Sequence, residues 1–396
     1  MLAPHIGIFG RRNYGKSSLV NFLTDQHVAI VSDTPGTTTD PVRKSMELLG
    51  VGPVVWVDTA GVDDDQDELG RLRILKTYEV LPQCDLVLVV FSNNIFGQEE
   101  RSLVEACRNR NTPFLLVYTR TDLSAPNATL IADLEAEYQT EVIEVSVRNP
   151  ELRAPLCAAI RSALPESAYV AKGLLNDVIG EGDTVVLVTP IDSSAPEGRM
   201  ILPQVQVLRN LMDLHAMAYF CQPDQLAATL DSLKEPPRLV ITDSQAFAQV
   251  SAIVPQQVML TSFSVVLARA KGLFSDYVKG TPMIDTLQDG DRVLLLESCT
   301  HNVTCEDIGR VKLPRLLARH TGKQLHCEVV SGLSGLERPI ADYKLVIQCG
   351  GCVVTPKQLA SRLMPAVLAG VPVSNYGLAI AYMTGIFNRS MQIFQQ

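Results

Sequence analysis

The sequence predicts an α/β protein in which a first domain with a phosphate-binding loop is followed by two smaller α/β domains. Short apolar runs alternate with amphipathic helical stretches, and a glycine-rich loop stands between the first apolar run and the first helix. The 396 residues exceed one ordinary hydrophobic core, and 46% hydrophobic with 19% charged residues is sufficient for several cores.

The first domain is expected over residues 1–168, with an end near Leu164-Pro165. An alternation of strands and helices is typical of a mostly parallel sheet with helices on both faces. The predicted strands are His5–Phe9, Ser45–Leu49, Val54–Val57, Leu86–Phe91, Phe114–Tyr118 and Val142–Val145.

Two further domains are expected over residues 172–262 and 263–396. The middle domain has predicted strands at Thr184–Val188 and Leu239–Thr242, and a predicted helix at Ile201–Ala218. A predicted helix at Phe263–Lys271 follows these strands, and a new run of elements starts near Gly280. Its predicted strands are Arg292–Glu297, Glu328–Val330 and Tyr343–Gln348, and its predicted helices are Val311–Thr321, Lys357–Ala369 and Leu378–Asn388.

Composition bounds the function classes. A net charge of −9 without a long Lys/Arg block argues against nucleic acid as the main partner. No stretch reaches about 18 uninterrupted apolar residues, so we expect no membrane span. The start of the chain lacks the pattern of a signal peptide, and nine cysteines are few for a secreted disulfide scaffold. We therefore expect a cytoplasmic protein whose cysteines are thiols or metal ligands.

A phosphate-loop pattern, G-x-x-x-x-G-K-[ST], occupies residues 10–17 between a strand and a helix. Its backbone N–H groups would wrap phosphates, Lys16 would reach the outer phosphates, and Ser17 would hold magnesium. The alternative is a glycine turn with a surface lysine. The nucleotide-binding residues expected here are Asn13, Tyr14, Gly15, Lys16, Ser17 and Ser18.

Asp58-Thr-Ala-Gly61 supplies the second half of a nucleotide site. An acid at the end of a strand holds magnesium through water, and the N–H of Gly61 senses the γ-phosphate. Between the two motifs, residues 35–40 read as a switch loop in which Thr38 is the expected magnesium contact, although a solvated polar loop is the alternative for this residue. Lys16, Thr38, Asp58 and Gly61 form the expected catalytic set.

The choice of base rests on Thr119-Arg-Thr-Asp122, which resembles the guanine motif N-K-x-D with Thr for Asn and Arg for Lys. Asp122 can accept from guanine N1–H and N2–H₂, which adenine does not offer, and Ser146-Val-Arg resembles the S-A-K motif. Losing the Asn amide removes roughly 1–3 kcal/mol of polar contacts. The sequence therefore predicts weak binding of GTP and GDP; an ordinary loop acid is the alternative for Asp122.

Two residues bear on hydrolysis. Val62 stands where water-orienting GTPases carry Gln, so no side chain there positions the attacking water. Asn13 matches the pattern of GTPases similar to the tRNA-modifying and ribosome-assembly enzymes, in which such an Asn ligates potassium. Potassium would supply positive charge where charge develops. In the alternative, Asn13 only shapes the loop.

Cysteines follow two strands of the third domain. Cys299-Thr-His301 and Cys349-Gly-Gly-Cys352 both lie at strand carboxyl ends, which meet at one edge of a parallel sheet. Three thiolates fit an iron–sulfur cluster, with His301 or an acid such as Glu306 on the fourth iron. A tetrahedral zinc on Cys299, His301, Cys349 and Cys352, a redox dithiol at Cys349 and Cys352, and unrelated core thiols stay open.

The other cysteines carry less information. Cys305 and Cys327 have no assignment from the sequence. Core positions in apolar helical stretches are expected for Cys84, Cys107, Cys157 and Cys221.

The spacing of Cys299-x-His301 and Cys349-x-x-Cys352, with 47 residues between them (302–348), resembles the HydF family of FeFe-hydrogenase maturation GTPases. Residues 190–199, 202–206 and 307–314 resemble that family as well. The resemblance implies a 4Fe–4S cluster on Cys299, Cys349 and Cys352, and a middle domain that forms the dimer. Departures from the family pattern are the guanine motif and Gln348, where the pattern has His.

The expected fold class is therefore α/β, a P-loop GTPase domain followed by two smaller α/β domains. The expected function is a magnesium-dependent, potassium-activated GTPase and iron–sulfur scaffold that assembles or delivers the di-iron subcluster of FeFe hydrogenase. The resemblance implies a homodimer or higher oligomer, with the hydrogenase apoprotein and radical-SAM maturases as partners. The rivals are a potassium-dependent GTPase of RNA modification or ribosome assembly with structural zinc, and a GTP-gated redox sensor.

Overall fold

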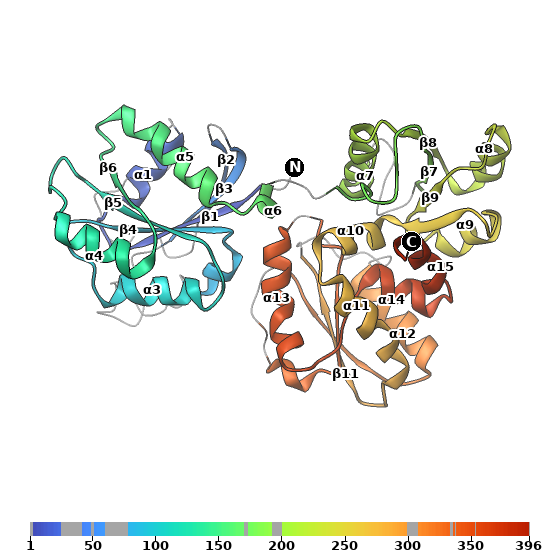
Figure 1. Cartoon of the computed structure of the whole chain (residues 1–396). Coiled ribbons are helices and arrows are strands. Elements are labelled where there is room, and N and C mark those ends of the chain that lie inside the picture. Colours follow the sequence, from blue (N-terminus) through green and yellow to red (C-terminus); the bar gives the residue numbers. More distant parts are fainter. Residues whose placement is uncertain are drawn as a thin grey trace. The chain divides into compact units, whose positions relative to one another are not determined.

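The computed structural model describes residues 3–24, 42–48, 51–59, 78–169, 173–191, 200–298, 308–332, 336, 338–352 and 354–395. The chain divides into two compact units, Met1–Ala171 and Lys172–Gln396 (Figure 1). Several residues named above lie outside the described residues: Thr38, Gly61, Val62, Cys299, His301, Cys305 and Glu306.

The first unit contains a six-stranded sheet with the strand order β2-β3-β1-β4-β5-β6. β2 is antiparallel to β3, and the other neighbouring pairs are parallel, so the predicted mostly parallel sheet is confirmed. The strands are β1 His5–Gly10, β2 Val42–Leu48, β3 Gly52–Asp58, β4 Leu86–Phe91, β5 Phe114–Thr119 and β6 Val142–Val145.

Helices cover both faces of this sheet, because the strands are apolar on both sides; β4 is buried at every position. Figure 1 shows α1 and α5 on one face and α3 and α4 on the other. The described helices are α1 Lys16–Thr24, α3 Gln98–Arg108, α4 Ala128–Tyr138, α5 Arg153–Ala163 and α6 Glu166–Tyr169.

The second unit begins with a parallel four-stranded sheet of order β10-β9-β7-β8. Its strands are β7 Thr184–Val188, β8 Met217–Cys221, β9 Leu239–Thr242 and β10 Met259–Ser262. Its helices are α7 Leu202–Asp213, α8 Leu226–Ser232, α9 Phe247–Ile253 and α10 Phe263–Lys271.

The predicted helix Ile201–Ala218 is wrong at its end. Helix α7 stops at Asp213, His215 adopts a left-handed φ of 55°, and the next residues form β8. β8 is an edge strand in which Met217, Tyr219 and Phe220 are exposed, so it lacks the alternation that announces a strand. Strand β10 was also missing from the prediction.

A second parallel sheet of the same unit has the order β12-β11-β13-β14. Its strands are β11 Arg292–Leu296, β12 His326–Val330, β13 Leu345–Gln348 and β14 Val373–Asn375. Its helices are α11 Phe274–Gly280, α12 Leu313–Thr321, α13 Pro356–Leu368, α14 Tyr376–Met383 and α15 Phe387–Met391.

Three predictions for this part need correction. Strand β14, which is only three residues long, was missed. The predicted helix Leu378–Asn388 is two helices, because Gly385 takes a φ of 77° between α14 and α15. The helix predicted from Val311 begins at Leu313, after a π-helical turn over Ile308–Lys312.

Helix α10 packs against both sheets of the second unit. Phe263, Val266 and Leu267 join the core of the first sheet, whereas Val265 and Ala268 join the core of the second. The domain bounds 1–168, 172–262 and 263–396 stay predictions, and a cut before residue 263 would assign this shared helix to one side alone.

Two further findings concern single side chains and helix length. As predicted, the four cysteines expected in the core are buried. The expected helical location is wrong for two of them, because Cys221 ends strand β8 and Cys84 is extended after a short 3-10 turn. Among the described residues, no helix has the length and the apolar character that crossing a bilayer requires.

Candidate functional site

The predicted phosphate loop joins the end of β1 to the start of α1. A Cβ atom at Gly10 would lie 2.2 Å from the carbonyl oxygen of Val90, so only glycine fits this close approach to β4. Gly15 has a φ of 81°, in the left-handed region that favours glycine. Glycine is therefore required at Gly10 by the close approach of β4 and favoured at Gly15 by the left-handed backbone.

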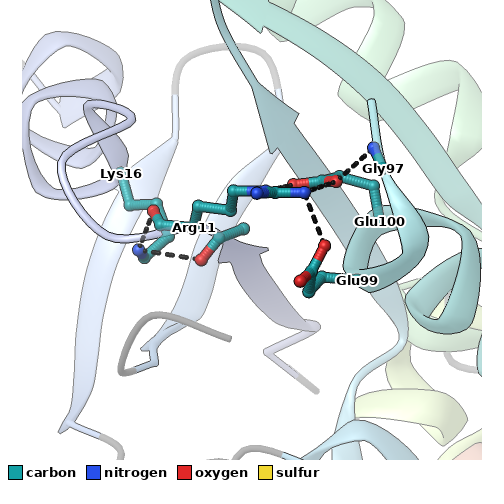
Figure 2. Close-up of polar contacts among 6 residues, drawn as sticks. Arg11, Lys16, Gly97, Glu99 and Glu100 are labelled. Carbon is teal, nitrogen blue, oxygen red and sulfur yellow. Dashed lines mark hydrogen bonds and ion pairs between the residues drawn. The ribbon is translucent and has the colours of Figure 1, made fainter. Parts of the chain in front are cut away.

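Lys16 is folded into this loop. Its Nζ donates to the carbonyl oxygens of Gly10, at 3.0 Å, and Arg11, at 2.8 Å (Figure 2). The residue is 8% exposed, so its charge lies over the loop rather than in bulk water. The N-terminus of α1 directly follows, and a cationic loop at a helix N-terminus is suited to a polyphosphate.

Arg11 fastens the loop to the start of α3 (Figure 2). Its Nε lies 2.8 Å from Oε1 of Glu100, its Nη2 lies 3.2 Å from Oε2 of Glu100, and Glu99 contacts the same Nη2 at 2.5 Å. Glu100 is fully buried and also accepts the backbone N–H of Gly97 at 2.7 Å. The hydrogen bond to Glu100 is the main cause of the raised pKa of Arg11.

Ser17 and Asp58, the expected magnesium ligands that the structure describes, lie next to each other. Strand β1 pairs with β3 so that Ile8 is opposite Asp58, and Ser17 Oγ donates to Asp58 Oδ2 at 3.2 Å. Thr59 Oγ1 donates to the carbonyl oxygen of Ile8 at 2.7 Å and holds the strand end in place. A hydroxyl beside a carboxylate is a donor set that fits a hard cation. The third expected magnesium ligand, Thr38, and Gly61, which was expected to sense the γ-phosphate, lie outside the described residues.

The predicted guanine-binding residues lie at the ends of β5 and β6. Ser146 Oγ donates to Asp122 Oδ1 at 2.7 Å, and Arg148 Nε lies 3.3 Å from Asp122 Oδ2. The hydrogen bond from Ser146 and, to a smaller extent, the charge of Arg148 lower the pKa of Asp122. An ionised carboxylate fits the paired N–H donors of a guanine edge.

Thr119 connects this base-binding region to the phosphate loop. Its hydroxyl donates to the carbonyl oxygen of Tyr14 at 2.6 Å, and the residue is 3% exposed. The next residue, Arg120, has a φ of 60°, and its Nε would lie 3.7 Å from a Cβ atom at Gly15. Thr119, which replaces the usual Asn, therefore contacts the loop, and the side chain of Arg120 lies close to Gly15.

The cysteine edge of the second unit lies where β11 and β13 end. The two strands end at one edge of a parallel sheet, as the sequence predicted. They are direct neighbours with Leu296 opposite Gln348, and the backbone N–H of Cys349 donates to the carbonyl oxygen of Leu296 at 2.8 Å. Ser298 ends the described part of the β11 side, and Cys299 is the next residue in the sequence.

The loop that contains Cys349 and Cys352 is held through its carbonyl groups. Lys271 Nζ donates to the carbonyl oxygens of Gly351 and Cys352, each at 3.1 Å. Asn375 Nδ2 donates to the carbonyl oxygen of Cys349 at 3.2 Å. Burial lowers the pKa of Lys271 to about 8, while the nearby Cys352 and Cys349 oppose that change.

Within the described ranges, no group of three His, Cys, Asp or Glu side chains forms a metal-ligand set. Cys349 and Cys352 fit one part of a thiolate site, because only two residues separate them in a restrained loop. The remaining predicted ligands, Cys299 and His301, belong to a segment that the structure does not describe.

Several residues of these edges were missed in the sequence analysis, Asn375 and Glu99 among them. The partners Arg11 and Glu100 are 89 residues apart, and no local pattern joins them. Ser298 and Lys271 have no motif of their own, although each contacts the Cys349–Cys352 loop. The sequence offered one signal for Arg11: it lies inside the phosphate-loop pattern, so a role near the nucleotide could have been expected.

Comparison with known proteins gives three matches along the chain. Residues 5–120 match a family model described as 50S ribosome-binding GTPase. Residues 174–272 match the hydrogen maturase F dimerization domain, and residues 275–393 match the hydrogen maturase F tetramerization domain.

Individual relatives are similar over a smaller part of the chain. The tRNA modification GTPase MnmE of Nitrosomonas europaea is 44% identical over 117 residues, which are 29% of this chain and 26% of that protein. MnmE of Nitrosomonas eutropha is 32% identical over 170 residues, or 41% and 37% of the two chains. The chain thus spans 26% to 37% of the length of these relatives.

Two solved structures are similar at a lower level. Era of Aquifex aeolicus bound to GDP·AlF₄⁻ has a TM-score of 0.38 and 19% identity, with 56% of this chain and 93% of that chain covered. The FeoB G-domain of Methanococcus jannaschii has a TM-score of 0.32 and 20% identity, with coverage of 41% and 98%.

The family matches agree with the order of the domains. The first is a P-loop GTPase domain, and further α/β domains follow it. Both of the later matches come from one maturase, and each covers one of the two parallel sheets of the second unit. The chain belongs to the HydF family of hydrogenase maturation GTPases.

Proposed function

We propose that the first unit hydrolyses GTP with magnesium and that the second unit holds an iron–sulfur cluster used in maturing FeFe hydrogenase. The observation that carries the second half is the parallel pairing of β11 with β13. It sets the Cys349–Cys352 loop beside Ser298, which directly precedes Cys299.

In the GTPase reaction, Lys16 would bind the outer phosphates and Asp122 the guanine. Ser17, Thr38 and Asp58 would hold magnesium, which offsets charge on the phosphate oxygens. To reach the phosphates, Lys16 Nζ would leave the carbonyl oxygens of Gly10 and Arg11. The Arg11–Glu100 pair would keep the loop in place during this change.

Potassium would be held by Asn13, whose left-handed φ of 61° turns the loop at this position. We expect faster hydrolysis in potassium than in sodium at equal ionic strength, because Val62 offers no polar group to orient water. Steady-state phosphate release in the two chloride salts is the measurement, and equal rates would remove the potassium assignment. Asn13→Ala should abolish the difference between the salts.

The cluster would be a 4Fe–4S centre on Cys299, Cys349 and Cys352, with His301 or Glu306 at the fourth iron. The cluster supplies an iron with an exchangeable ligand, to which a di-iron precursor could attach as cargo. The di-iron precursor would be delivered to the FeFe-hydrogenase apoprotein after radical-SAM maturases have acted on it. This delivery would take place in the cytoplasm. The matches to two hydrogen maturase F domains support this role.

Oligomerisation would begin at β8. This edge strand of the sheet within the dimerization match exposes Met217, Tyr219 and Phe220, at 50%, 41% and 44%. Exposed apolar side chains on an edge strand are a natural site for a second copy of the chain. A homodimer through this strand, with higher assembly through residues 275–393, agrees with the family matches.

The test is anaerobic reconstitution of the full chain, followed by iron and sulfide analysis and by EPR of the reduced protein. About four irons and four sulfides per chain are expected, with absorbance near 400 nm. His301→Ala should keep iron and change the EPR signal, whereas Cys305→Ala should change neither. A colourless protein that binds one zinc per chain would reject the cluster and favour a structural zinc site.

A further inference from the structure

The sulfur of Cys349 lies within hydrogen-bond distance of three polar atoms, two N–H donors and one hydroxyl. The backbone N of Ser298 is 3.1 Å from Sγ, the side-chain Nε2 of Gln348 is 3.2 Å away, and the Oγ of Ser298 is 3.3 Å away. Gln348 is fully buried and Ser298 is 7% exposed. Bulk water therefore competes little for these contacts.

These donors form a chain with one direction. Gln348 Nε2 donates to Ser298 Oγ at 2.9 Å, which leaves the Ser298 hydroxyl proton available for the sulfur. While Cys349 carries a proton, its S–H can donate to Ser298 Oγ instead. A cysteine bound to iron has no S–H, so its sulfur only accepts, and the Ser298 hydroxyl must then donate to it.

The same reasoning fixes the orientation of the Gln348 amide. A carbonyl oxygen turned toward a metal-bound sulfur would place two acceptors together, whereas Nε2 offers a proton. Among the described residues, Gln348 Oε1 has no hydrogen-bond partner. The arrangement that satisfies the sulfur therefore leaves the amide oxygen without a described donor.

Two further side chains hold the backbone around the sulfur. Asn375, 1% exposed, donates to the carbonyl oxygen of Cys349, and Lys271 holds the carbonyl oxygens two and three residues later. Gln348 Nε2 also donates to the carbonyl oxygen of Cys349, at 3.3 Å. Replacing Gln348 would therefore remove this contact together with the contact to the sulfur, whereas the contacts from Asn375 and Lys271 would stay in place.

We propose that Gln348 and Ser298 are positioning residues that raise the reduction potential of the cluster by donating hydrogen bonds to the Cys349 sulfur. The proposal rests on the proposed cluster site. Reduction adds negative charge that the ligand sulfurs share, so donors at a sulfur stabilise the reduced cluster more than the oxidised one. Gln348 would thus act through Cys349 and not as an iron ligand.

The experiment is an EPR-monitored redox titration of the reconstituted full chain and its variants. Gln348→Met keeps the approximate size of the side chain and removes the donor. We expect about a tenfold shift of the reduction equilibrium toward the oxidised cluster, which equals about 59 mV for a one-electron couple. Gln348→Glu, which brings a negative charge, should shift it further.

A second variant and a control separate donation from packing. Ser298→Ala removes the hydroxyl, keeps the backbone N–H and should lower the potential less than Gln348→Met does. The double variant should shift less than the sum of the two, because both act through one chain of hydrogen bonds. Ser374→Ala is the control: it removes a fully buried hydroxyl that contacts Thr281 at 2.7 Å, and it should keep the wild-type potential.

The outcomes are distinguishable. A wild-type chain that takes up no iron and sulfide rejects the proposed cluster itself. A wild-type chain with a cluster, but with equal potentials in Gln348→Met and Ser298→Ala, overturns the role of the donors and leaves the cluster site intact. If Gln348→Met loses the cluster, Ser298→Ala decides alone: a lower potential, with loss of an exchangeable-proton coupling in ENDOR, supports the proposal, and an unchanged potential and spectrum overturn it.

Discussion

The phosphate loop of residues 10–17, with Asp58, forms the nucleotide edge of the first unit. This edge and the cysteine edge of the second unit occupy the same place in their sheets, at the carboxyl ends of parallel strands. They are restrained by different chemistry. The phosphate loop is held by an ion pair, Arg11 with Glu100, and the cysteine loop by hydrogen bonds from Lys271, Asn375 and Gln348.

The difference follows from the expected ligands. A polyphosphate needs cations near it, and carboxylates on the far side of Arg11 balance the charge of the loop without facing the phosphate-binding backbone. A thiolate shared with iron needs N–H and O–H donors more than it needs full charges. Each edge can therefore be tested by removing the kind of contact on which it depends.

The largest effect is expected at the nucleotide edge. Lys16→Ala should weaken GTP binding by at least about 100-fold, because one cation among the phosphates is lost. Isothermal titration measures the affinity for GTP, and iron analysis measures whether the cysteine edge still holds its cluster. The comparison would break if this variant also lost its iron, because the two edges would then depend on one another.

The reciprocal change belongs to the cysteine edge. Cys349→Ala should lose the cluster, since a thiolate ligand contributes to assembly itself. Its GTP affinity should equal that of the wild type within about twofold. Cys157→Ala serves as a matched control, because this thiol is 5% exposed in the core of the first unit and should leave both iron and GTP binding intact.

A smaller effect tests the ion pair. Glu100→Gln removes the buried charge opposite Arg11 and should weaken GTP binding by about tenfold, from roughly 1–2 kcal/mol of lost interaction. Glu99→Gln is the matched control on the same guanidinium: its carboxylate is 39% exposed, so we expect a change of about twofold or less. Equal effects of the two substitutions would contradict the role given to burial.

The smallest effect concerns the base-binding region. Thr119→Val keeps the shape and removes the hydroxyl bonded to Tyr14, so GTP affinity should fall about threefold to tenfold. Thr119→Asn should instead tighten binding by up to about tenfold, because the amide restores a contact to guanine and reaches the loop as well. Competition with fluorescent GDP measures both. A Val variant that binds like the wild type would show that the tether does not matter.

The parts that could be predicted from the sequence were those with a local pattern. β4 is predicted at its observed bounds, Leu86–Phe91, because all six residues are apolar, and the phosphate loop follows from eight consecutive residues. β8 could not be found, because three of its apolar residues are exposed and it lacks the alternation of a half-buried strand. Gln348 stands next to Cys349 in sequence, but its donor role depends on Ser298, 50 residues away.

The C-terminal residues of the chain join the core of the middle sheet, and this has a consequence for biosynthesis. The core of the middle sheet contains Ile393 together with Phe263 and Val266, and Arg389 donates to the carbonyl oxygens of Val254 and Pro255 at 2.7 Å and 2.9 Å. The GTPase domain can fold once residue 171 has left the ribosome, because its core is complete by then. The core of the middle sheet is complete only when residue 393 arrives, about 210 residues after its first strand begins to emerge. During that interval β8, with its exposed apolar side chains, is already synthesised, so pairing of two such strands would compete with completion of the sheet.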